Sequence, residues 1–236
     1  MILGAILRSP WFKGLVGEQL VRLAAWLRLD KTVYHAIHDV TLPTPDGTTQ
    51  IDHVFVSPYG IFVVETKNYS GWIFGGEHQP NWTQKIYRTT HKFQNPLRQN
   101  YKHLKALESL LDVPPETLHS VIVFVGGSTF KTPMPPNVTY AGGYVRYIQS
   151  FQTRVFSREQ VEAMVSAISS GRKKPGFNTN REHVRQLQSR HDVTAPRLCP
   201  RCGSAMVLRE VKKGGNVGKS FWGCSQYPKR RAVQNT

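Results

Sequence analysis

The chain has 236 residues, of which 39% are hydrophobic, and it carries a formal net charge of +16. This composition is too apolar for a disordered chain, and no segment approaches the ~20 consecutive apolar residues of a membrane span. The positive charge is concentrated: residues 171–236 carry a net charge of +12, and residues 1–170 only +4. A basic tail joined to a nearly neutral domain predicts binding to a polyanion. A tail kept only for solubility is the alternative, and the aromatic residues within the tail weaken it.

The chain opens with the apolar segment Met1–Leu7, which Arg8 ends. The charged n-region and the cleavage site of a signal peptide are missing, so the expected location is cytoplasmic. Two interpretations stay open for this segment: the first turn of a docked helix, or the stub of a longer membrane anchor that would give membrane contact. Residues 14–29 then predict an amphipathic helix. Its predicted buried face consists of Val16, Leu20, Leu23, Ala24 and Leu27.

Three strands are predicted next, over Thr32–Val40, Ile51–Val56 and Ile61–Lys67, because these segments are rich in β-branched and aromatic residues. Between the second and the third, Pro58 and Tyr59 predict a two-residue hairpin turn.

A further hairpin is predicted over Gly71–Tyr87, and a helix follows with Asn95 as its N-cap and Pro96 at its first position. This helix is expected to end before Pro114. The remaining predicted elements are a buried strand over Ser120–Val125, a short strand near Val138–Tyr140 and a helix over Arg158–Ser169. The order of elements is that of an α/β fold.

Charged residues interrupt the two apolar strands of the hairpin: Asp52 lies in one, and Glu65 and Lys67 lie in the other. Side chains alternate along a strand, so Glu65 and Lys67 share a face, and the predicted turn places Asp52 opposite Glu65. Two neighbouring carboxylates repel unless a cation lies between them, and Mg²⁺ or Mn²⁺ suits such a site. Lys67 would orient or deprotonate an attacking water. Solvated surface charges are the alternative, which the apolar character of both strands disfavours.

Four separated motifs occur in order over about residues 10–125. They are Gly14-Leu-Val-Gly-Glu18, Gln50-Ile-Asp52-His53, Gly60-Ile-Phe-Val-Val-Glu65-Thr-Lys67-Asn68 and Asn95-Pro96-x-x-Gln99. Together they resemble the NERD (nuclease-related) domain, a branch of the PD-(D/E)XK phosphodiesterase superfamily. The resemblance implies a restriction-endonuclease-like αβββαβ core. It also implies that Glu18, Asp52, Glu65 and Lys67 form the acidic, metal-binding centre.

Three further polar residues, Glu18, Gln99 and Gln84, each have two interpretations. Glu18 is predicted to lie opposite the apolar stripe of its helix, where a first-turn Glu that offsets the helix dipole is the alternative to an outer metal ligand. Gln99 is a candidate for contact with the substrate or with the coordination shell of the metal, and the alternative is a surface residue without a role. The same two interpretations apply to Gln84. His53 points away from the Asp52 face and is predicted to be structural. The histidines without metal-ligand spacing are His35, His38, His78, His91, His103 and His119.

The tail holds the three cysteines of the chain, Cys199, Cys202 and Cys224. Cys-x-x-Cys spacing predicts metal binding in a reducing compartment. Cys199-Pro-Arg-Cys202-Gly and Phe221-Trp-Gly-Cys224-Ser-Gln-Tyr-Pro resemble the zinc ribbons at the C-termini of bacterial type I topoisomerases, which use four thiolates. Arg230 stands where the fourth Cys is expected. Zinc held by three thiolates with water or a distant His191, and a metal-free ribbon, both stay open.

The tail is expected to bind nucleic acid with or without zinc. Trp222 or Tyr227 would stack on bases, and basic residues would contact phosphates, which predicts little sequence preference and a steep dependence on salt. The expected phosphate-binding residues are Lys212, Lys213, Lys219, Lys229, Arg230 and Arg231.

The sequence thus predicts a nuclease-like domain over residues 10–170, a basic linker over 171–195 with a helix near Arg181–Ser189, and a zinc-ribbon-like β module over 196–236. The predicted function is a divalent-metal-dependent nuclease acting on DNA, single-stranded or branched DNA included, without a small-molecule cofactor. A non-catalytic DNA-binding module built on the same core is the alternative.

Overall fold

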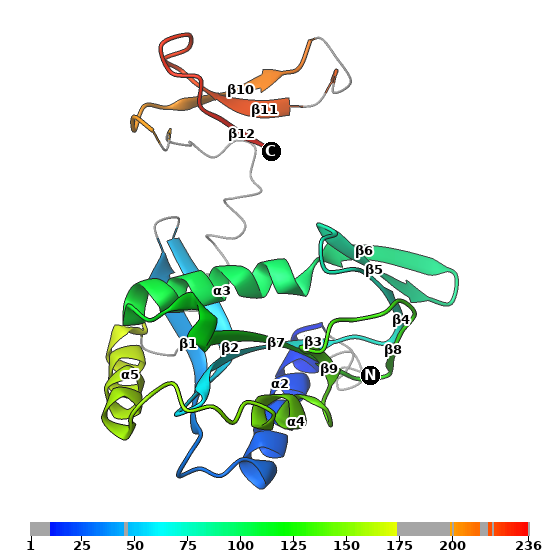
Figure 1. Ribbon diagram of the computed structural model, residues 1–236. Helices are drawn as coiled ribbons and strands as arrows, with labels where there is room; N and C mark the ends of the chain where they lie inside the picture. The colour runs from blue at the N-terminus through cyan, green and yellow to red at the C-terminus, as the bar shows by residue number, and fades with distance from the viewer. Residues whose placement is uncertain are drawn as a thin grey trace. The chain divides into compact units, whose positions relative to one another are not determined.

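The computed structural model describes residues 10–44, 47–173, 199, 201–212, 217–218 and 220–235, with the side chains of residues 10–13 and 235 left out. The chain divides into two compact units, Met1–Thr179 and Asn180–Thr236. The first is a mixed α/β domain and the second a small β module, as predicted (Figure 1). The apolar segment Met1–Leu7 and the predicted linker helix near Arg181–Ser189 lie outside the described residues.

A five-stranded sheet in the order β1-β2-β3-β7-β9 forms the centre of the first unit. Its strands are β1 (His35–Thr44), β2 (Gly47–Ser57), β3 (Gly60–Asn68), β7 (Leu118–Val125) and β9 (Val138–Tyr140). The first three are antiparallel, whereas β7 pairs in parallel with both β3 and β9. A parallel pair needs a crossover connection, and the crossover from β3 to β7 contains α3 (Pro96–Leu111). This order contains the predicted αβββαβ core.

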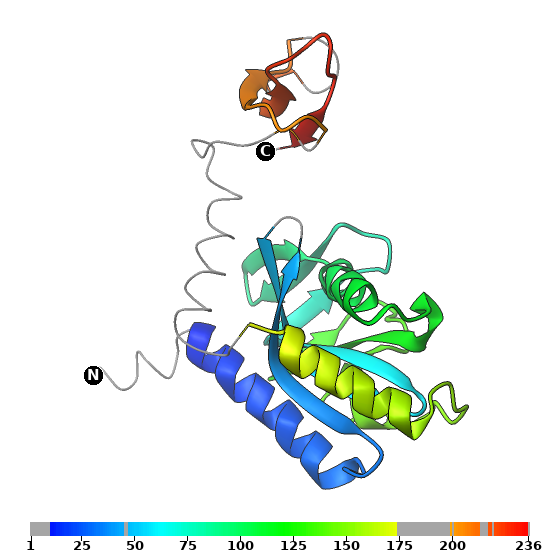
Figure 2. The same ribbon diagram turned by 90° about the vertical axis from the view of Figure 1, so that its left-hand side faces the viewer.

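Helices cover both faces of this sheet, and in Figure 2 α2 (Pro10–Arg28) and α5 (Arg158–Gly171) lie on opposite sides of β1. On one face, α3 and α5 pack on a cluster that includes Val54 and Val63. On the other, α2 and α4 (Tyr144–Gln149) pack on a cluster that includes Val64. The alternation of residues 63 and 64 between the two clusters follows from the period of two in a strand.

A second sheet has the order β6-β5-β4-β8. Its strands are β4 (Gly71–Phe74), β5 (Asn81–Ile86), β6 (Thr89–Gln94) and β8 (Ser128–Phe130). The predicted hairpin over residues 71–87 is confirmed as β4 and β5, while β6 and β8 were not predicted. One face of this sheet is buried: Ile73 and Trp82 are inaccessible to solvent and pack with Phe124 of β7.

The apolar face predicted for the first helix is wrong. The predicted residues Leu20, Leu23 and Leu27 are 48%, 53% and 63% exposed. The buried positions are instead Gly17, Val21, Ala25 and Leu29. Small residues select this face because they let the helix approach the sheet closely: a Cβ on Gly17 would lie 2.8 Å from Val125 Cγ2. Glu18 follows Gly17, so it flanks the packed face instead of lying opposite it.

The two other predicted helices begin as expected. The Asn95 side chain accepts a hydrogen bond from the Leu97 amide at 2.9 Å, with Pro96 at the start of α3. Ser157 and Gln160 form a capping box at the start of α5. The short helix α4 was not predicted. No helix in the described part of the chain combines the length and the apolar content that a bilayer crossing requires.

The second unit contains an antiparallel sheet of β10 (Met206–Glu210), β11 (Ser220–Cys224) and β12 (Val233–Asn235). Its hydrophobic core, within the described residues, consists of Cys199, Met206, Trp222, Cys224 and Ala232. Two of the three cysteines therefore lie in the core of the module, together with one aromatic ring.

Candidate functional site

The predicted register of the β2–β3 hairpin is confirmed, since Ser57 pairs with Gly60 and His53 pairs with Val64. The next step along the same register would place Asp52 opposite Glu65. At this point the Thr66 amide donates to Asp52 Oδ2 at 2.8 Å. The Asp52 side chain thus reaches β3 and is fixed there, at the end of the β2–β3 ladder.

Glu65 lies at the centre of a closed set of hydrogen bonds. Its Oε1 accepts from Lys67 Nζ at 2.7 Å and from Gln99 Nε2 at 2.8 Å. Lys67 Nζ also donates to Gln99 Oε1 at 2.8 Å. The structure therefore brings together three of the predicted site residues, two from β3 and one from the first turns of α3.

His103 is a contact of Glu65 that the sequence reading missed. Its Nδ1 lies 2.7 Å from Thr49 Oγ1, and its Nε2 lies 3.3 Å from Glu65 Oε2. His103 Nε2 and Glu65 Oε2 are both buried, and neither atom makes a hydrogen bond within the described residues. The signal in the sequence is the four-residue spacing between Gln99 and His103, which places both on one side of α3.

The carboxyl groups of the site differ in acidity. Burial raises the pKa of Asp52 well above its usual value, and the Glu65 charge adds to this effect. Burial would also raise the pKa of Glu65, but Lys67 and His103 outweigh it and hold the value at about 2. For Lys67, burial lowers the pKa, and the attraction of Glu65 overcomes this, so that the net change is upward. Asp52 and Glu65 are therefore close enough to repel, which favours a cation at the site.

Two acidic residues extend the site toward α2. Burial raises the pKa of Glu18, and the charges of Asp39 and Glu65 raise it further, while Arg22 lowers it. Asp39, which the sequence reading missed, accepts a hydrogen bond from Arg22 at 2.6 Å. β1 pairs with β2 on either side of Asp39, so it occupies the register position opposite Asp52, with a left-handed φ of 53°. Glu18 thus lies within electrostatic reach of the predicted centre.

The carboxylates of the acidic centre are more widely spaced than the ligand atoms of a compact metal site. Among the described residues, the three cysteines are the only group of three or more potential His, Cys, Asp or Glu ligands whose ligand atoms lie within 4.8 Å of one another. Glu18, Asp52 and Glu65 form a looser set. Such a set suits Mg²⁺, which keeps several waters and phosphate oxygens in its coordination shell.

A cavity of about 540 Å³ adjoins Lys67. Its walls include Thr66, Lys67 and Asn68 of β3, Gln84 and Ile86 of β5, and Gly126 and Gly127 after β7. Gln84 is buried and donates to the Ser70 carbonyl at 2.8 Å, so its side chain supports the wall. The second sheet thereby contributes to the surroundings of Lys67.

Residues 13–125 match the family model described as Nuclease-related domain, NERD. This part of the chain is similar to the NERD family. Over 104 residues the chain is 51% identical to an uncharacterized protein of Bacillus anthracis, which corresponds to 44% of this chain and 49% of that protein. The chain therefore matches about half the length of this relative. The NERD segment includes all of the acidic centre, together with Lys67, Gln99 and His103, and it ends before the cysteines.

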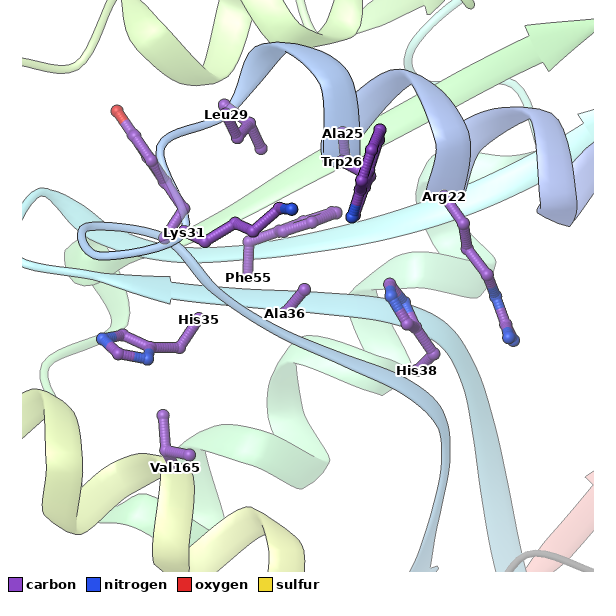
Figure 3. Close-up of a pocket in the computed structure, with 11 residues that line it drawn as sticks. Arg22, Ala25, Trp26, Leu29, Lys31, His35, Ala36, His38, Phe55 and Val165 are labelled. Atoms are coloured by element: carbon purple, nitrogen blue, oxygen red, sulfur yellow. The ribbon is translucent and has the colours of Figure 1, made fainter.

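The first unit holds a second cavity, of about 350 Å³, between α2 and β1 (Figure 3). Arg22 and Trp26 line it from α2 and His38 from β1, and Lys31 Nζ lies 4.1 Å from the centre of the Trp26 ring. Next to it, His38 Nδ1 lies 3.0 Å from Nδ1 of the buried His53, whose pKa burial lowers to about 3. His53 contacts His38 and Thr66, on the strand face away from Glu65.

The three cysteines of the second unit gather around one point. Their sulfur atoms all lie within 4.8 Å of one another, and Cys202 Sγ is 3.6 Å from Cys224 Sγ. The amides of Cys202 and Gly203 both donate to the Cys199 carbonyl, at 3.3 and 2.8 Å, which curls the chain around the sulfurs. In the described residues no fourth ligand joins this group; Arg230 is exposed, and His191 lies outside the described residues.

The residues of the second unit that were predicted to bind nucleic acid differ in solvent exposure. Lys212, Lys229, Arg230 and Arg231 are exposed, while Lys213 and Lys219 lie outside the described residues. Trp222 is only 6% exposed, so the prediction that its ring stacks on bases is wrong: this ring builds the core of the module. Tyr227 is 57% exposed, and the Arg209 guanidinium, which the sequence reading missed, lies 5.4 Å from its ring centre.

Proposed function

We propose that this chain is a divalent-metal-dependent nuclease, in which the NERD domain hydrolyses phosphodiester bonds of DNA and the cysteine-bearing module holds the substrate. The observation that carries the proposal is the linked group of Glu65, Lys67 and Gln99, with the Asp52 carboxylate bound to the same strand. An ammonium beside two carboxylates is the minimal equipment for this reaction.

Asp52 and Glu65 would hold the divalent ion. Their donor atoms are carboxylate oxygens, which hard cations such as Mg²⁺ and Mn²⁺ prefer. Glu65 Oε2 is a buried oxygen that makes no hydrogen bond within the described residues, and the repulsion that raises the pKa of Asp52 would be relieved by a cation. When bound, the ion supplies Lewis-acid activation of the phosphate and of a water molecule.

The side chains around the ion have separate tasks. Lys67 stabilises negative charge that develops on the phosphate oxygens, because its ammonium is fixed by Glu65 and Gln99 and need not reorganise. Gln99, on α3, positions the Lys67 ammonium and the Glu65 carboxylate. Glu18, half-buried at the edge of the centre, binds a water of the outer shell.

A cleavage assay on the full chain tests this function. Single-stranded, duplex and branched DNA, and RNA, are incubated with Mg²⁺, Mn²⁺ or EDTA. We expect cutting that needs the metal and that falls at least ~100-fold in Asp52→Asn and Lys67→Met. Glu108→Gln on α3, which removes a carboxylate paired with Lys105, is the control and should cut normally.

Two results would reject the proposal. Equal cutting by all variants would place the active centre elsewhere. DNA binding that ignores EDTA, with no turnover in any metal, would make the chain a non-catalytic DNA-binding module.

The cysteine cluster of the second unit would hold zinc. Thiolate sulfur is a preferred zinc ligand, and three sulfurs within 4.8 Å of one another leave one tetrahedral position for water or another group. Elemental analysis of the purified chain should find about one zinc per chain, lost in Cys224→Ser. An absence of zinc in the wild type under reducing conditions would make the ribbon metal-free.

A further inference from the structure

The second sheet of the first unit has a solvent-exposed face in addition to its buried one. Trp72 pairs with Lys85 across β4 and β5, and Lys85 pairs with Thr90 of β6. Directly paired residues of a sheet point to the same side, and residues two apart along a strand do so as well. This rule collects one set of side chains opposite the buried Ile73 and Trp82. The part of this set around Trp72, here called the Trp72 face, consists of Trp72, Phe74, Thr83, Lys85, Thr90, Lys92, Thr129 and Lys131.

The Trp72 face is cationic and aromatic. Trp72 is 47% exposed, with Lys131 Nζ at 4.6 Å and Lys85 Nζ at 5.7 Å from its ring centre. Its three lysines are exposed, and none of its eight residues is acidic. Within the described residues, none of these lysines makes an ion pair.

The lysines of the Trp72 face differ in this respect from Lys105 of α3. Lys105 also lies over an exposed aromatic ring, with its Nζ 5.7 Å from the Tyr101 ring centre. Its charge, however, is paired with Glu108 at 2.6 Å. The lysines of the Trp72 face thus keep their charge available for an anionic ligand.

An exposed aromatic ring between unpaired cations suits one class of ligand in particular. A base of a single strand can stack on the ring while the flanking phosphates contact the lysines, whereas the bases of a duplex are already stacked on one another. The face also belongs to the sheet that lines the cavity beside Lys67: Gln84 points into that cavity, and its neighbour Lys85 points to the Trp72 face.

We propose that the Trp72 face binds single-stranded nucleic acid and so holds an unpaired part of the substrate on the NERD domain itself. This rests on the proposed function, because it takes a nucleic acid as the substrate. The residues of this site lie outside the cysteine module, where the sequence predicted phosphate contacts and base stacking.

Binding measured in EDTA tests the proposal without any cleavage. The full chain is titrated into a labelled single-stranded oligonucleotide and into the matching duplex, and anisotropy is followed. Trp72→Ala should weaken single-strand binding by about 5- to 150-fold and leave duplex binding within about twofold. In Lys85→Glu/Lys131→Glu, the slope of log affinity against log salt for the single strand should fall by about 1.4.

The control is Lys102→Glu/Lys105→Glu on α3, which changes the net charge by the same amount and should keep the wild-type slope. An unchanged affinity in Trp72→Ala, or an equal loss in the control, would overturn the proposal. The binding assay needs no metal, so it is independent of cleavage. A chain that binds through Trp72 yet never cuts would therefore contradict only the nuclease function. A chain that cuts, but whose single-strand affinity is unchanged in Trp72→Ala, would contradict only this binding site.

Photo-crosslinking separates this face from the cysteine module. A single-stranded oligonucleotide with photoreactive bases is crosslinked to the full chain, and the linked peptides are identified by mass spectrometry. We expect a linked peptide that contains Trp72, and its loss in Lys85→Glu/Lys131→Glu. Crosslinks confined to residues 196–236 would contradict the proposal.

Discussion

At the scale of single residues, the candidate site depends on Glu65. Its carboxylate accepts hydrogen bonds from Lys67 and Gln99 and faces His103 on its other side. Because Lys67 is itself largely buried, loss of the Glu65 charge leaves an ammonium without its partner.

We therefore expect Glu65→Gln to lower the free energy of unfolding by about 3 kcal/mol, and Glu65→Gln/Lys67→Met to recover part of the loss. Urea denaturation of the wild type, both single variants and the double variant measures the coupling between the two residues. Additive effects in this cycle would mean that the pair does not interact.

The residues of this site were predictable to different degrees. The neighbourhood of Asp52, Glu65 and Lys67 follows from strand alternation and one hairpin turn, which are local rules. His103 and Asp39 could not be placed in the same way. The first depends on the position of α3 over the sheet, and the second depends on a left-handed residue within β1.

At the scale of elements, two helix caps of the first unit differ in what surrounds them. Asn95 is buried, and besides capping α3 its amide donates to the carbonyls of Glu77 and Gln79 at 2.9 and 2.7 Å. Ser157 caps α5 at an exposed position. Asn95→Ala should destabilise the domain by about 3 kcal/mol and Ser157→Ala by only about 1 kcal/mol, as measured by chemical denaturation. Equal losses would show that the loop contacts of Asn95 contribute nothing.

His119 of β7 should make the free energy of unfolding depend on pH. Burial beside Phe62 and Phe151 lowers the pKa of His119 from its ordinary value of 6.5. The unfolded chain therefore binds a proton that the folded chain resists, so the free energy of unfolding should fall as the pH drops from 7.5 to 5. His38 and His53, whose pKa values are also lowered, act in the same direction.

His119→Gln should flatten this dependence in part. The measurement is thermal or urea unfolding of wild type and variant at several pH values. The same fall with pH in both would mean that His119 is not one of the groups responsible.

The elements themselves were largely predictable, since strands and caps carry local signals, but the orientation of α2 was not. Its leucines recur at helical spacing, yet the packed side carries Gly17, Val21, Ala25 and Leu29, because at position 17 a side chain would collide with Val125. Periodicity reports that a helix has an apolar side. It does not report which side approaches a sheet most closely.

At the scale of the whole molecule, most of the positive charge and the acidic centre lie in different parts of the chain. Residues 171–236 carry a net charge of +12, whereas the acidic centre lies within residues 13–125. If the second unit holds DNA by its phosphates, Lys229→Glu/Arg231→Glu should lower the salt slope of duplex binding by about 1.8 and raise KM without changing kcat. Steady-state cleavage at several salt concentrations gives all three quantities. A fall in kcat alone would contradict a role in binding.

The division into two units was foreseeable from the distribution of charge and cysteine along the chain. The exposed surface of the second unit was not foreseeable, because Trp222 is buried and Arg209 of β10 lies beside Tyr227. Sequence spacing gives the composition of such a surface, but the pairing of strands decides which side chains it exposes.

Manganese binding tests the account most directly, since its central claim is that Asp52 and Glu65 share a divalent ion. Free Mn²⁺ is followed by electron paramagnetic resonance while the full chain is titrated. We expect one bound ion per chain at millimolar Mn²⁺, abolished by Asp52→Asn and retained in Glu162→Gln, where the lost carboxylate is paired with Arg158 on α5. Identical binding curves for wild type and Asp52→Asn would contradict the account.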